Sequence, residues 1–387
     1  MDPVYLDCAA TTPVESAVAE VVIHYLKEEF GNAGSRTHEY GNRAKVAVQK
    51  ARAQVGQVVG APREDVIFTS GATESNNLAI LGLTEYARSE SRTHFITSST
   101  EHKAVLEPFL RLGELGFRVT YLDPGPDGFV TPEALAKAVS ADTALVSLMH
   151  VNNETGVIQP LAAYCEVLRN HAAFLHVDAA QSFGKVPYAL DDTRIDLISA
   201  SAHKIYAPKG IGALICRRRD FKMPPLSPLM FGGGQERGLR PGTLPVPLIA
   251  GFGAAAELSM KHQVARQKAC AKTKVEALHH LCAVGGIPNV PGEHTISSTL
   301  NISFPGLDSE AIMLALKSLV AISNGSACTS QSYTSSHVLK AMGLPTERIR
   351  SAIRISWCHL TPIVPWAVVA SKISELFPVG QRSSAAK

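Results

Sequence analysis

The sequence lacks the features that would place the chain in a membrane, outside the cell or on a nucleic acid. No stretch of 18 residues is apolar throughout, and the longest candidate, 244–258, is interrupted by Pro245, Pro247, Gly251 and Gly253, which argues against a membrane span. No basic stretch followed by an apolar one occurs at the N-terminus, so no signal peptide is expected. The net charge of +3, from 37 basic and 34 acidic residues, is too small to predict direct nucleic-acid binding.

Cysteine pairs at metal-binding or disulfide-scaffold spacing are also lacking. The seven cysteines are odd in number, widely scattered and without a C-x-x-C pair, which fits neither a disulfide scaffold nor a zinc site. No metal site is therefore expected, and a reducing cytoplasm is the simplest location. With 45% hydrophobic and 18% charged residues, the chain can bury a large core, so wholesale disorder is excluded.

Short apolar runs alternate with helix-like segments between about residue 50 and residue 215. Strands separated by helices predict βαβ units and a mainly parallel sheet that is buried on both faces, hence an α/β fold. The expected strands are 66–69, 94–97, 144–148, 174–177, 197–199 and 211–215, and the expected helices are 72–83, 103–115 and a segment after Pro160.

The pattern changes near residue 250 and predicts a smaller α+β domain. A long helix is expected over 250–284, a strand over 298–304, a helix over 309–319 and a strand over 351–357. The length of 387 residues suggests about two domains. We expect a large domain over 14–255, a small domain made of 1–13 plus 256–378, and a disordered tail over 379–387.

Two polar segments follow expected strands, where ligands bind in open α/β sheets. Residues 69–77 form a small-residue turn that opens a helix, and free N–H groups at a helix start bind phosphate; an ordinary Ser/Thr helix cap is the alternative. Asp178 comes directly after a buried strand among small residues. Its carboxylate would suit a protonated ring nitrogen, although a helix cap or a salt bridge would explain it equally well.

A lysine and a cysteine stand out by their surroundings. Lys204 ends a segment, 199–204, with almost no other charge. Burial would lower its pKa and allow imine chemistry, whereas a solvent-facing lysine is the commoner alternative. Cys328 lies in the polar stretch 322–332, where a thiol could move and react, because a core cysteine needs apolar neighbours. The other six cysteines are expected to fill space.

A phosphate cradle, an aspartate for a pyridine nitrogen and an imine-forming lysine are the parts that a pyridoxal phosphate site needs. Their order and spacing resemble the NifS/IscS-type cysteine desulfurases, members of the class V aminotransferase family within fold type I. The resemblance covers nearly the whole chain and is carried by residues 5–13, 68–77, 100–105, 151–156, 176–182, 199–204, 240–245, 325–330 and 354–356.

The resemblance implies a fold type I transferase whose large domain binds pyridoxal 5′-phosphate. Lys204 would hold the cofactor covalently and later move the substrate's α-proton. Asp178 would pair with the pyridine nitrogen, His102 would stack on the ring and move protons, and Gln181 would bind the phenolic oxygen. The phosphate would be held by Ala72, Thr73, Ser201 and His203.

The resemblance also implies a substrate clamp and a homodimer. Arg354, with Asn153 and Asn32, would bind the substrate carboxylate, since a guanidinium fits that planar anion; Asn153 would contact the cofactor as well. Thr243 would reach the phosphate in the neighbouring subunit, so the sites would be composite.

The implied reaction is desulfuration of L-cysteine. Cys328, as a thiolate, would take the substrate's sulfur and leave L-alanine, and its persulfide would pass to an acceptor protein for iron–sulfur clusters, tRNA thiolation or DNA phosphorothioation. Two sequence departures concern the acceptor: residues 357–361 read WCHLT where cluster-assembly members usually carry LGRFT, and Pro241 replaces the usual Ser or Gly. With the short C-terminal segment, they make DNA phosphorothioation fit at least as well as cluster assembly.

Other functions stay open at this point. An aminotransferase or a selenocysteine lyase on the same fold would keep its activity without Cys328. A binding or scaffold protein would have kept the fold without the chemistry, and the set of Lys204, Asp178, His102 and Cys328 argues against it.

Overall fold

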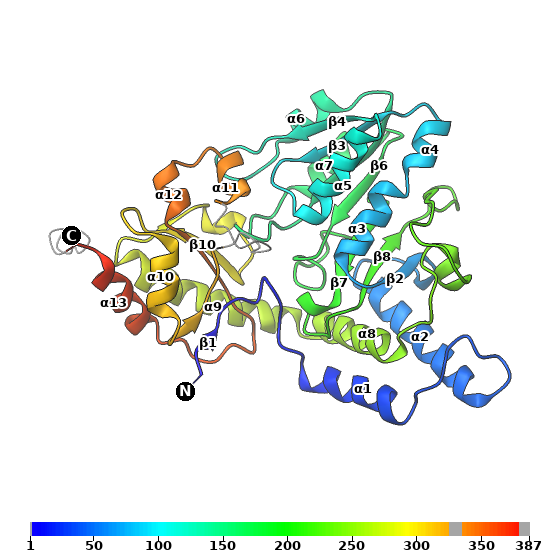
Figure 1. Ribbon diagram of the computed structural model, residues 1–387, viewed down its shortest axis with the longest axis horizontal. Coiled ribbons are helices and arrows are strands. Elements are labelled where there is room, and N and C mark those ends of the chain that lie inside the picture. Colours follow the sequence, from blue (N-terminus) through cyan, green and yellow to red (C-terminus); the bar gives the residue numbers. More distant parts are fainter. Residues whose placement is uncertain (1, 325–334, 379–387) are drawn as a thin grey trace.

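A seven-stranded sheet forms the centre of the larger part of the molecule (Figure 1). This computed structural model describes residues 2–324 and 335–378, so Cys328 and the tail 379–387 lie outside the described residues. Along the sheet the strands are β2 (Val66–Thr69), β8 (Gly212–Cys216), β7 (Leu197–Ser201), β6 (Phe174–Asp178), β5 (Thr143–Met149), β3 (His94–Ser98) and β4 (Arg118–Leu122). Only the pairs that β8 makes with β2 and β7 are antiparallel, so the predicted mainly parallel sheet is confirmed.

Successive side chains of the strands face two separate hydrophobic layers, as the two-residue period of a strand requires. In β2, Ile67 belongs to one buried cluster and Phe68 to the other; in β3, Phe95 and Ile96 divide in the same way. Six of the seven strands are buried along their whole length. The expected burial on both faces is therefore confirmed for them.

Helices cover both faces of this sheet. One cluster packs it against α1 (Ser16–Lys27), α2 (Glu39–Gln57), α6 (Pro132–Ala138), α7 (Leu161–Val167) and α8 (Val246–Lys261). The other packs it against α3 (Ala72–Leu81), α4 (Thr84–Ser89) and α5 (Lys103–Glu114).

A second, antiparallel sheet lies to the left in Figure 1 and has its own core. It contains β12 (Ala352–Ser356), β10 (Thr299–Ser303) and β9 (Ile287–Pro288), with α9 (Gln263–Cys282), α10 (Ser309–Leu316), α11 (His337–Ala341), α12 (Thr346–Arg350) and α13 (Trp366–Leu376) around it. Strand β1 (Val4–Tyr5) pairs in parallel with β11 (Val320–Ala321). Short 3₁₀ turns are η1 (Arg63–Asp65), η2 (Ala202–Lys204), η3 (Gln235–Gly238) and η4 (Gly292–His294).

The single helix expected over 250–284 is wrong, because the chain forms α8 and α9 with a break at His262. α8 packs on α1 and α2, whereas α9 packs on α13, so the two helices belong to different packing layers. Within residues 2–324 and 335–378, no helix combines the length and the apolar character that crossing a membrane requires.

Candidate active site

Loops at the carboxyl ends of β2, β3, β5, β6 and β7 surround a cavity of about 720 Å³. Because these strands are parallel, the loops that follow them meet at one edge of the sheet. Residues 7–10 and β12 close the remaining side. The cavity brings together ten of the residues expected from the sequence: Ala72, Thr73, His102, Asn153, Asp178, Gln181, Ser201, His203, Lys204 and Arg354.

Lys204 lies in η2, directly after β7, and its amine projects to residues 9 and 10. Its Nζ donates to the carbonyl oxygens of Ala9 at 2.5 Å and Ala10 at 2.7 Å. Burial lowers the pKa of Lys204 to about 7, helped by the positive charges of Lys185 and Arg354. A large share of the amine is therefore uncharged at neutral pH and can attack a carbonyl carbon.

Asp178 ends β6 and holds its carboxylate in a fixed orientation. Oδ2 accepts from Asn76 Nδ2 at 2.7 Å, and Oδ1 accepts from the Ala180 N–H at 2.9 Å. A carboxylate oriented in this way suits a protonated ring nitrogen. Asn76 was missed from the sequence, and the signal for it was a polar side chain on the buried face of the expected helix 72–83.

A second carboxyl group, that of Glu101, lies behind Asp178. Glu101 is fully buried, and its Oε1 accepts from the Met149 N–H at 2.6 Å; Met149 pairs with Asp178 across β5 and β6. Burial and the neighbouring Asp178 raise the pKa of Glu101 well above its ordinary value. Both effects favour the neutral, protonated form of Glu101 over its charged form.

His102 caps α5 and is held in one tautomer. Its Nδ1 accepts from the Ala104 N–H at 3.1 Å, and burial lowers its pKa below the ordinary value. A neutral ring that accepts at Nδ1 carries its proton on Nε2. His102 can therefore offer a proton from Nε2 to a group in the cavity.

The start of α3 and the start of β8 form a cradle for an anion. Gly71 caps α3, and the following residues line the cavity together with Ser201 and His203. A Cβ on Gly212 would lie 2.6 Å from Gly71 Cα and 2.5 Å from the Ala200 oxygen, so only glycine allows β8 to approach. Free N–H groups and hydroxyls in this arrangement fit a phosphate.

Arg354 projects from β12 into the cavity and is 5% exposed. Its Nη2 donates to Asp7 Oδ1 at 2.7 Å and its Nη1 to the Asn153 oxygen at 3.0 Å. Its buried Nε has no partner among the described residues. A buried guanidinium with a free donor fits a carboxylate ligand. Asp7 was not expected as a partner of Arg354, although it lies within residues 5–13, one of the segments that carry the family resemblance.

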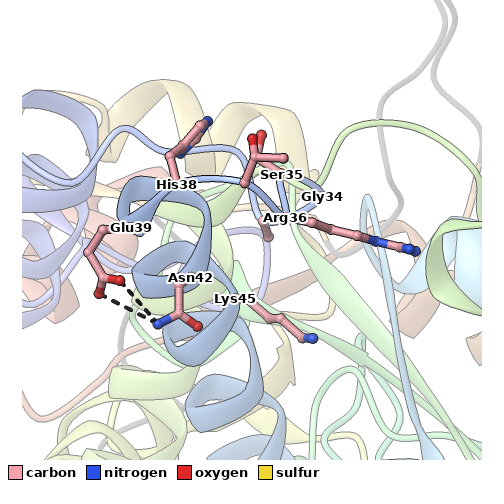
Figure 2. Close-up of a pocket in the computed structure, with 9 residues that line it drawn as sticks. Gly34, Ser35, Arg36, His38, Glu39, Asn42 and Lys45 are labelled. Atoms are coloured by element: carbon pink, nitrogen blue, oxygen red, sulfur yellow. Dashed lines mark hydrogen bonds between the residues drawn. The ribbon is translucent and has the colours of Figure 1, made fainter.

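Asn32 and Thr243 do not line this cavity. Asn32 Oδ1 accepts from the Gly34 N–H at 2.8 Å, and the loop that follows lines a separate pocket with α2 (Figure 2). Figure 2 shows Arg36 and Lys45 extending to the same side of that pocket. Cys328 lies outside the described residues, but Ser323, close before it in sequence, lines the cavity beside Arg354.

The other six cysteines were expected to fill space. Cys8, Cys165, Cys216, Cys270 and Cys358 are buried, whereas Cys282 is exposed, so the expectation is wrong for Cys282. Cys282 does not belong to the buried face of α9, which includes Cys270, Ala277 and Leu281.

Known proteins match the chain along most of its length. The family model described as Aminotransferase class-V matches residues 4–362. A curated relative named Cysteine desulfurase IscS, from Anaeromyxobacter sp. (strain Fw109-5), is 45% identical over 361 residues, which cover 93% of this chain and 88% of the relative.

Solved structures are similar over the same span. A NifS-like protein superposes with a TM-score of 0.89 at 36% identity, covering 97% of this chain and 99% of that one. DndA from Streptomyces lividans superposes with a TM-score of 0.80 at 50% identity, covering 92% and 99%. The fold is that of the fold type I pyridoxal phosphate enzymes, and the chain belongs to the class-V aminotransferase family.

Proposed function

We propose that this cavity binds pyridoxal 5′-phosphate and L-cysteine and that the chain is a cysteine desulfurase. The observation that carries the proposal is a lysine with a pKa of about 7 in one cavity with Asp178 and the free Nε of Arg354. Lys204 provides an amine that can react with the carbonyl carbon of the cofactor. Asp178 provides an anion for the ring nitrogen of the cofactor, and Arg354 provides a cation for the carboxylate of the substrate. The curated relatives named cysteine desulfurase support the same activity.

The residues of the cavity fit the cofactor group by group. The cradle at the start of α3, with Ser201 and His203, would hold the phosphate; Asp178 would face the ring nitrogen; Gln181, whose Nε2 donates to the Ala9 oxygen at 2.9 Å, would face the phenolic oxygen. When bound, pyridoxal phosphate supplies an electron sink for a carbanion at the substrate's α-carbon.

The chain's own groups would then bind the substrate and move its protons. Arg354 and Asn153 orient the carboxylate of L-cysteine, and Lys204 holds and returns the α-proton as a base of matched pKa. His102 exchanges a proton at Nε2 with the substrate. Cys328, as a thiolate, would accept the sulfur atom of L-cysteine. L-Cysteine and the Cys328 thiol thereby become L-alanine and a Cys328 persulfide. An acceptor protein would then receive the outer sulfur atom of the persulfide.

The proposal includes a homodimer with composite sites and two domains. Thr243 would reach the phosphate of the neighbouring subunit, which agrees with its absence from the lining of its own cavity. The division into 14–255 and 1–13 plus 256–378 is supported by two separate hydrophobic cores. The cytoplasmic location stays a prediction from the sequence.

The test is an absorbance spectrum of the purified protein with and without L-cysteine, with alanine and sulfide assayed for wild type and Cys328→Ala. We expect the visible band of a lysine-bound pyridoxal cofactor in both proteins, and alanine only from wild type. Lys204→Ala should lose the band, while the nearby Lys209→Ala, also on the cavity wall, should keep it.

Two results would contradict the proposal. A protein that shows no band even after cofactor is added would not be a pyridoxal enzyme of this kind. A band with unchanged alanine formation in Cys328→Ala would indicate an aminotransferase or a selenocysteine lyase.

A further inference from the structure

A buried tyrosine two residues after Lys204 has a strained backbone conformation. Tyr206 is 5% exposed, and its φ is 70°. Bulky residues rarely adopt this left-handed conformation, because their Cβ approaches the following carbonyl oxygen. Among the described non-glycine residues with positive φ, Tyr206 and Glu236 are buried and the others are exposed. A strained residue in the interior persists only where its surroundings hold it.

Hydrogen bonds hold the backbone of Tyr206 on both sides. Its N–H donates to Thr12 Oγ1 at 3.0 Å, and its carbonyl oxygen accepts from the Glu15 N–H at 3.0 Å. The Thr12 hydroxyl in turn donates to the His203 oxygen at 2.9 Å. The segment from Thr12 to Glu15 therefore holds the chain both before and after Lys204.

The ring of Tyr206 contacts two side chains from the part of the molecule built around the antiparallel sheet. The guanidinium carbon of Arg266, near the start of α9, lies 5.0 Å from the ring centre, an arrangement that attracts the cation to the ring. The ring of His359, which follows β12, meets Tyr206 edge-on at 4.5 Å between centres. Glu15 holds both partners: Arg266 Nη2 donates to Glu15 Oε2 at 2.7 Å, and His359 Nε2 lies 3.0 Å from Glu15 Oε1.

We propose that Tyr206 is a positioning residue for Lys204, through which the antiparallel-sheet part of the molecule keeps the lysine amine inside the cavity. The left-handed turn at Tyr206 bends the chain directly after η2, and the ring contacts with Arg266 and His359 stabilise this conformation. Lys204 Nζ then lies against its two backbone acceptors rather than in water. The catalytic role of Lys204 rests on the proposed function, whereas the position of its amine does not.

Loss of the ring would let the turn relax and the amine reach water. Desolvation is the largest cause of the lowered pKa of Lys204, so a hydrated amine would return toward the ordinary pKa of about 10.4. A rise of one unit from about 7 lowers the neutral fraction of the amine at pH 7 about fivefold. The charged and titratable groups that act on the amine or lie near it stay the same in variants of Tyr206, and they are Lys185, Arg354, Asp7, Asp178, His102 and His203.

The experiment measures the reactivity of the Lys204 amine in the full chain freed of cofactor. Trace acetic anhydride acetylates neutral amines, and mass spectrometry of the digested protein gives the labelled fraction at each pH. We expect a midpoint of about 7 in wild type, a midpoint higher by about one unit or more in Tyr206→Ala, and the wild-type midpoint in Tyr206→Phe, which keeps the ring. Labelling of Lys209, also on the cavity wall, should be the same in all proteins. No cofactor takes part, so the result does not depend on the proposed activity.

Two further variants separate positioning from general loss of stability. Tyr86→Ala removes a ring contact with Phe174, and neither residue lines the cavity, so it should lower the Tm and leave the Lys204 midpoint unchanged. Arg266→Lys keeps a positive charge for Glu15 but loses the planar guanidinium that stacks on the ring. Its midpoint should rise in the otherwise wild-type chain, and should rise no further when it is combined with Tyr206→Ala.

The variant Tyr206→Gly tests the backbone itself. Glycine adopts positive φ freely, so Tyr206→Gly should have a higher Tm than Tyr206→Ala, the reverse of the order expected at an ordinary backbone position. The proposal is wrong if folded Tyr206→Ala keeps the wild-type midpoint, if Tyr206→Phe shifts the midpoint as far as Tyr206→Ala does, or if Tyr206→Gly has the lower Tm. Should Tyr206→Ala fail to fold, an unchanged midpoint in Arg266→Lys would overturn the proposal equally.

Discussion

Burial controls the charge of three side chains at the cavity, Lys204, His102 and Glu101. Desolvation is the largest cause of each pKa change, and it disfavours whichever form is charged. The lysine and the histidine therefore lose positive charge, and the glutamate loses negative charge. The cavity gains a nucleophilic amine and a neutral imidazole, while Asp7 and Asp178 remain as acidic groups of its lining.

The lowered pKa of Lys204 predicts how cofactor-free protein takes up pyridoxal phosphate. Only the neutral amine reacts with a carbonyl, so the uptake rate should rise with pH through a midpoint of about 7. The charge of Asp7 raises the pKa of Lys204, so Asp7→Asn should move the midpoint to lower pH. Stopped-flow absorbance gives both values; a midpoint near the ordinary lysine value of about 10.4 would show that the amine is not desolvated.

The raised pKa of Glu101 predicts a pH-dependent effect of Glu101→Gln on stability. Below about pH 4.3 the carboxyl is protonated in both states, but above it only the unfolded state ionises, so the contribution of Glu101 to the free energy of unfolding falls as pH rises. Glutamine cannot ionise and keeps the acceptor for the Met149 N–H. The variant's Tm relative to wild type should therefore be higher at about pH 8 than at about pH 4; a difference in the opposite direction would mean an ionised Glu101.

Single residues were predicted from the sequence where a motif and a strand end coincided. Lys204 follows β7 and Asp178 ends β6, so the strand pattern placed both at one edge, whereas His102 was predicted from the family resemblance. Asp7 was missed because it acts through Arg354, and a partnership across the fold leaves no local signal. Asn76 acts through Asp178, and its one signal was a polar side chain on the buried face of the expected helix 72–83. The roles of the predicted residues stay predictions.

The contact between β8 and the α3 cradle predicts a local effect of Gly212→Ala. The added methyl group would collide with backbone on two sides, and neither backbone can give way as a flexible side chain would. We expect a loss of about 1–3 kcal/mol in the free energy of unfolding, with weaker cofactor binding. Gly113→Ala is the matched control, since a Cβ there meets nothing within 4 Å, and it should leave the free energy of unfolding unchanged or raise it. Equal effects of the two substitutions would contradict the close approach of β8 to the start of α3.

A buried ion pair fixes the position of η3, which precedes Thr243 in the sequence. Glu236 in η3 binds Arg52 of α2 at 2.5 Å and accepts from the Phe68 N–H at 2.7 Å. Arg52→Leu would leave a buried carboxylate without its counter-charge, at a cost of about 3–5 kcal/mol. Urea unfolding measures the loss, and Lys372→Ala at the exposed Lys372–Glu375 pair should cost less than about 1 kcal/mol.

The elements differ in how far the sequence could predict them. Apolar runs identified six strands of the large sheet, but β4 was missed because it lies at the edge and only its last residue, Leu122, is buried. The antiparallel direction of β8 could not be predicted from periodicity, which is the same for both directions. The break at His262 was missed because it is set by the two surfaces on which α8 and α9 pack.

The composite dimer predicts that two inactive variants restore each other. In a mixed dimer of Lys204→Ala and Thr243→Ala, one site has both substitutions, while the other combines an intact Lys204 with an intact Thr243 from its partner. Mixing the unfolded subunits and refolding them should therefore recover cofactor binding in part. Size-exclusion chromatography checks that dimers form, and no recovery in confirmed mixed dimers would contradict the cross-subunit role of Thr243.

The pairing of β1 with β11 has a consequence for how the chain is made. Residues 4–10 leave the ribosome before β11 and β12, with which they pair and which follow more than 300 residues later. At about 5–20 residues per second, the leading segment waits on the order of 15 to 60 seconds for its partners. Since the carbonyl oxygens of Ala9 and Ala10 accept from Lys204, the nascent chain cannot complete its lysine site before β11 and β12 have been made, and loading with pyridoxal phosphate is a step that follows their synthesis.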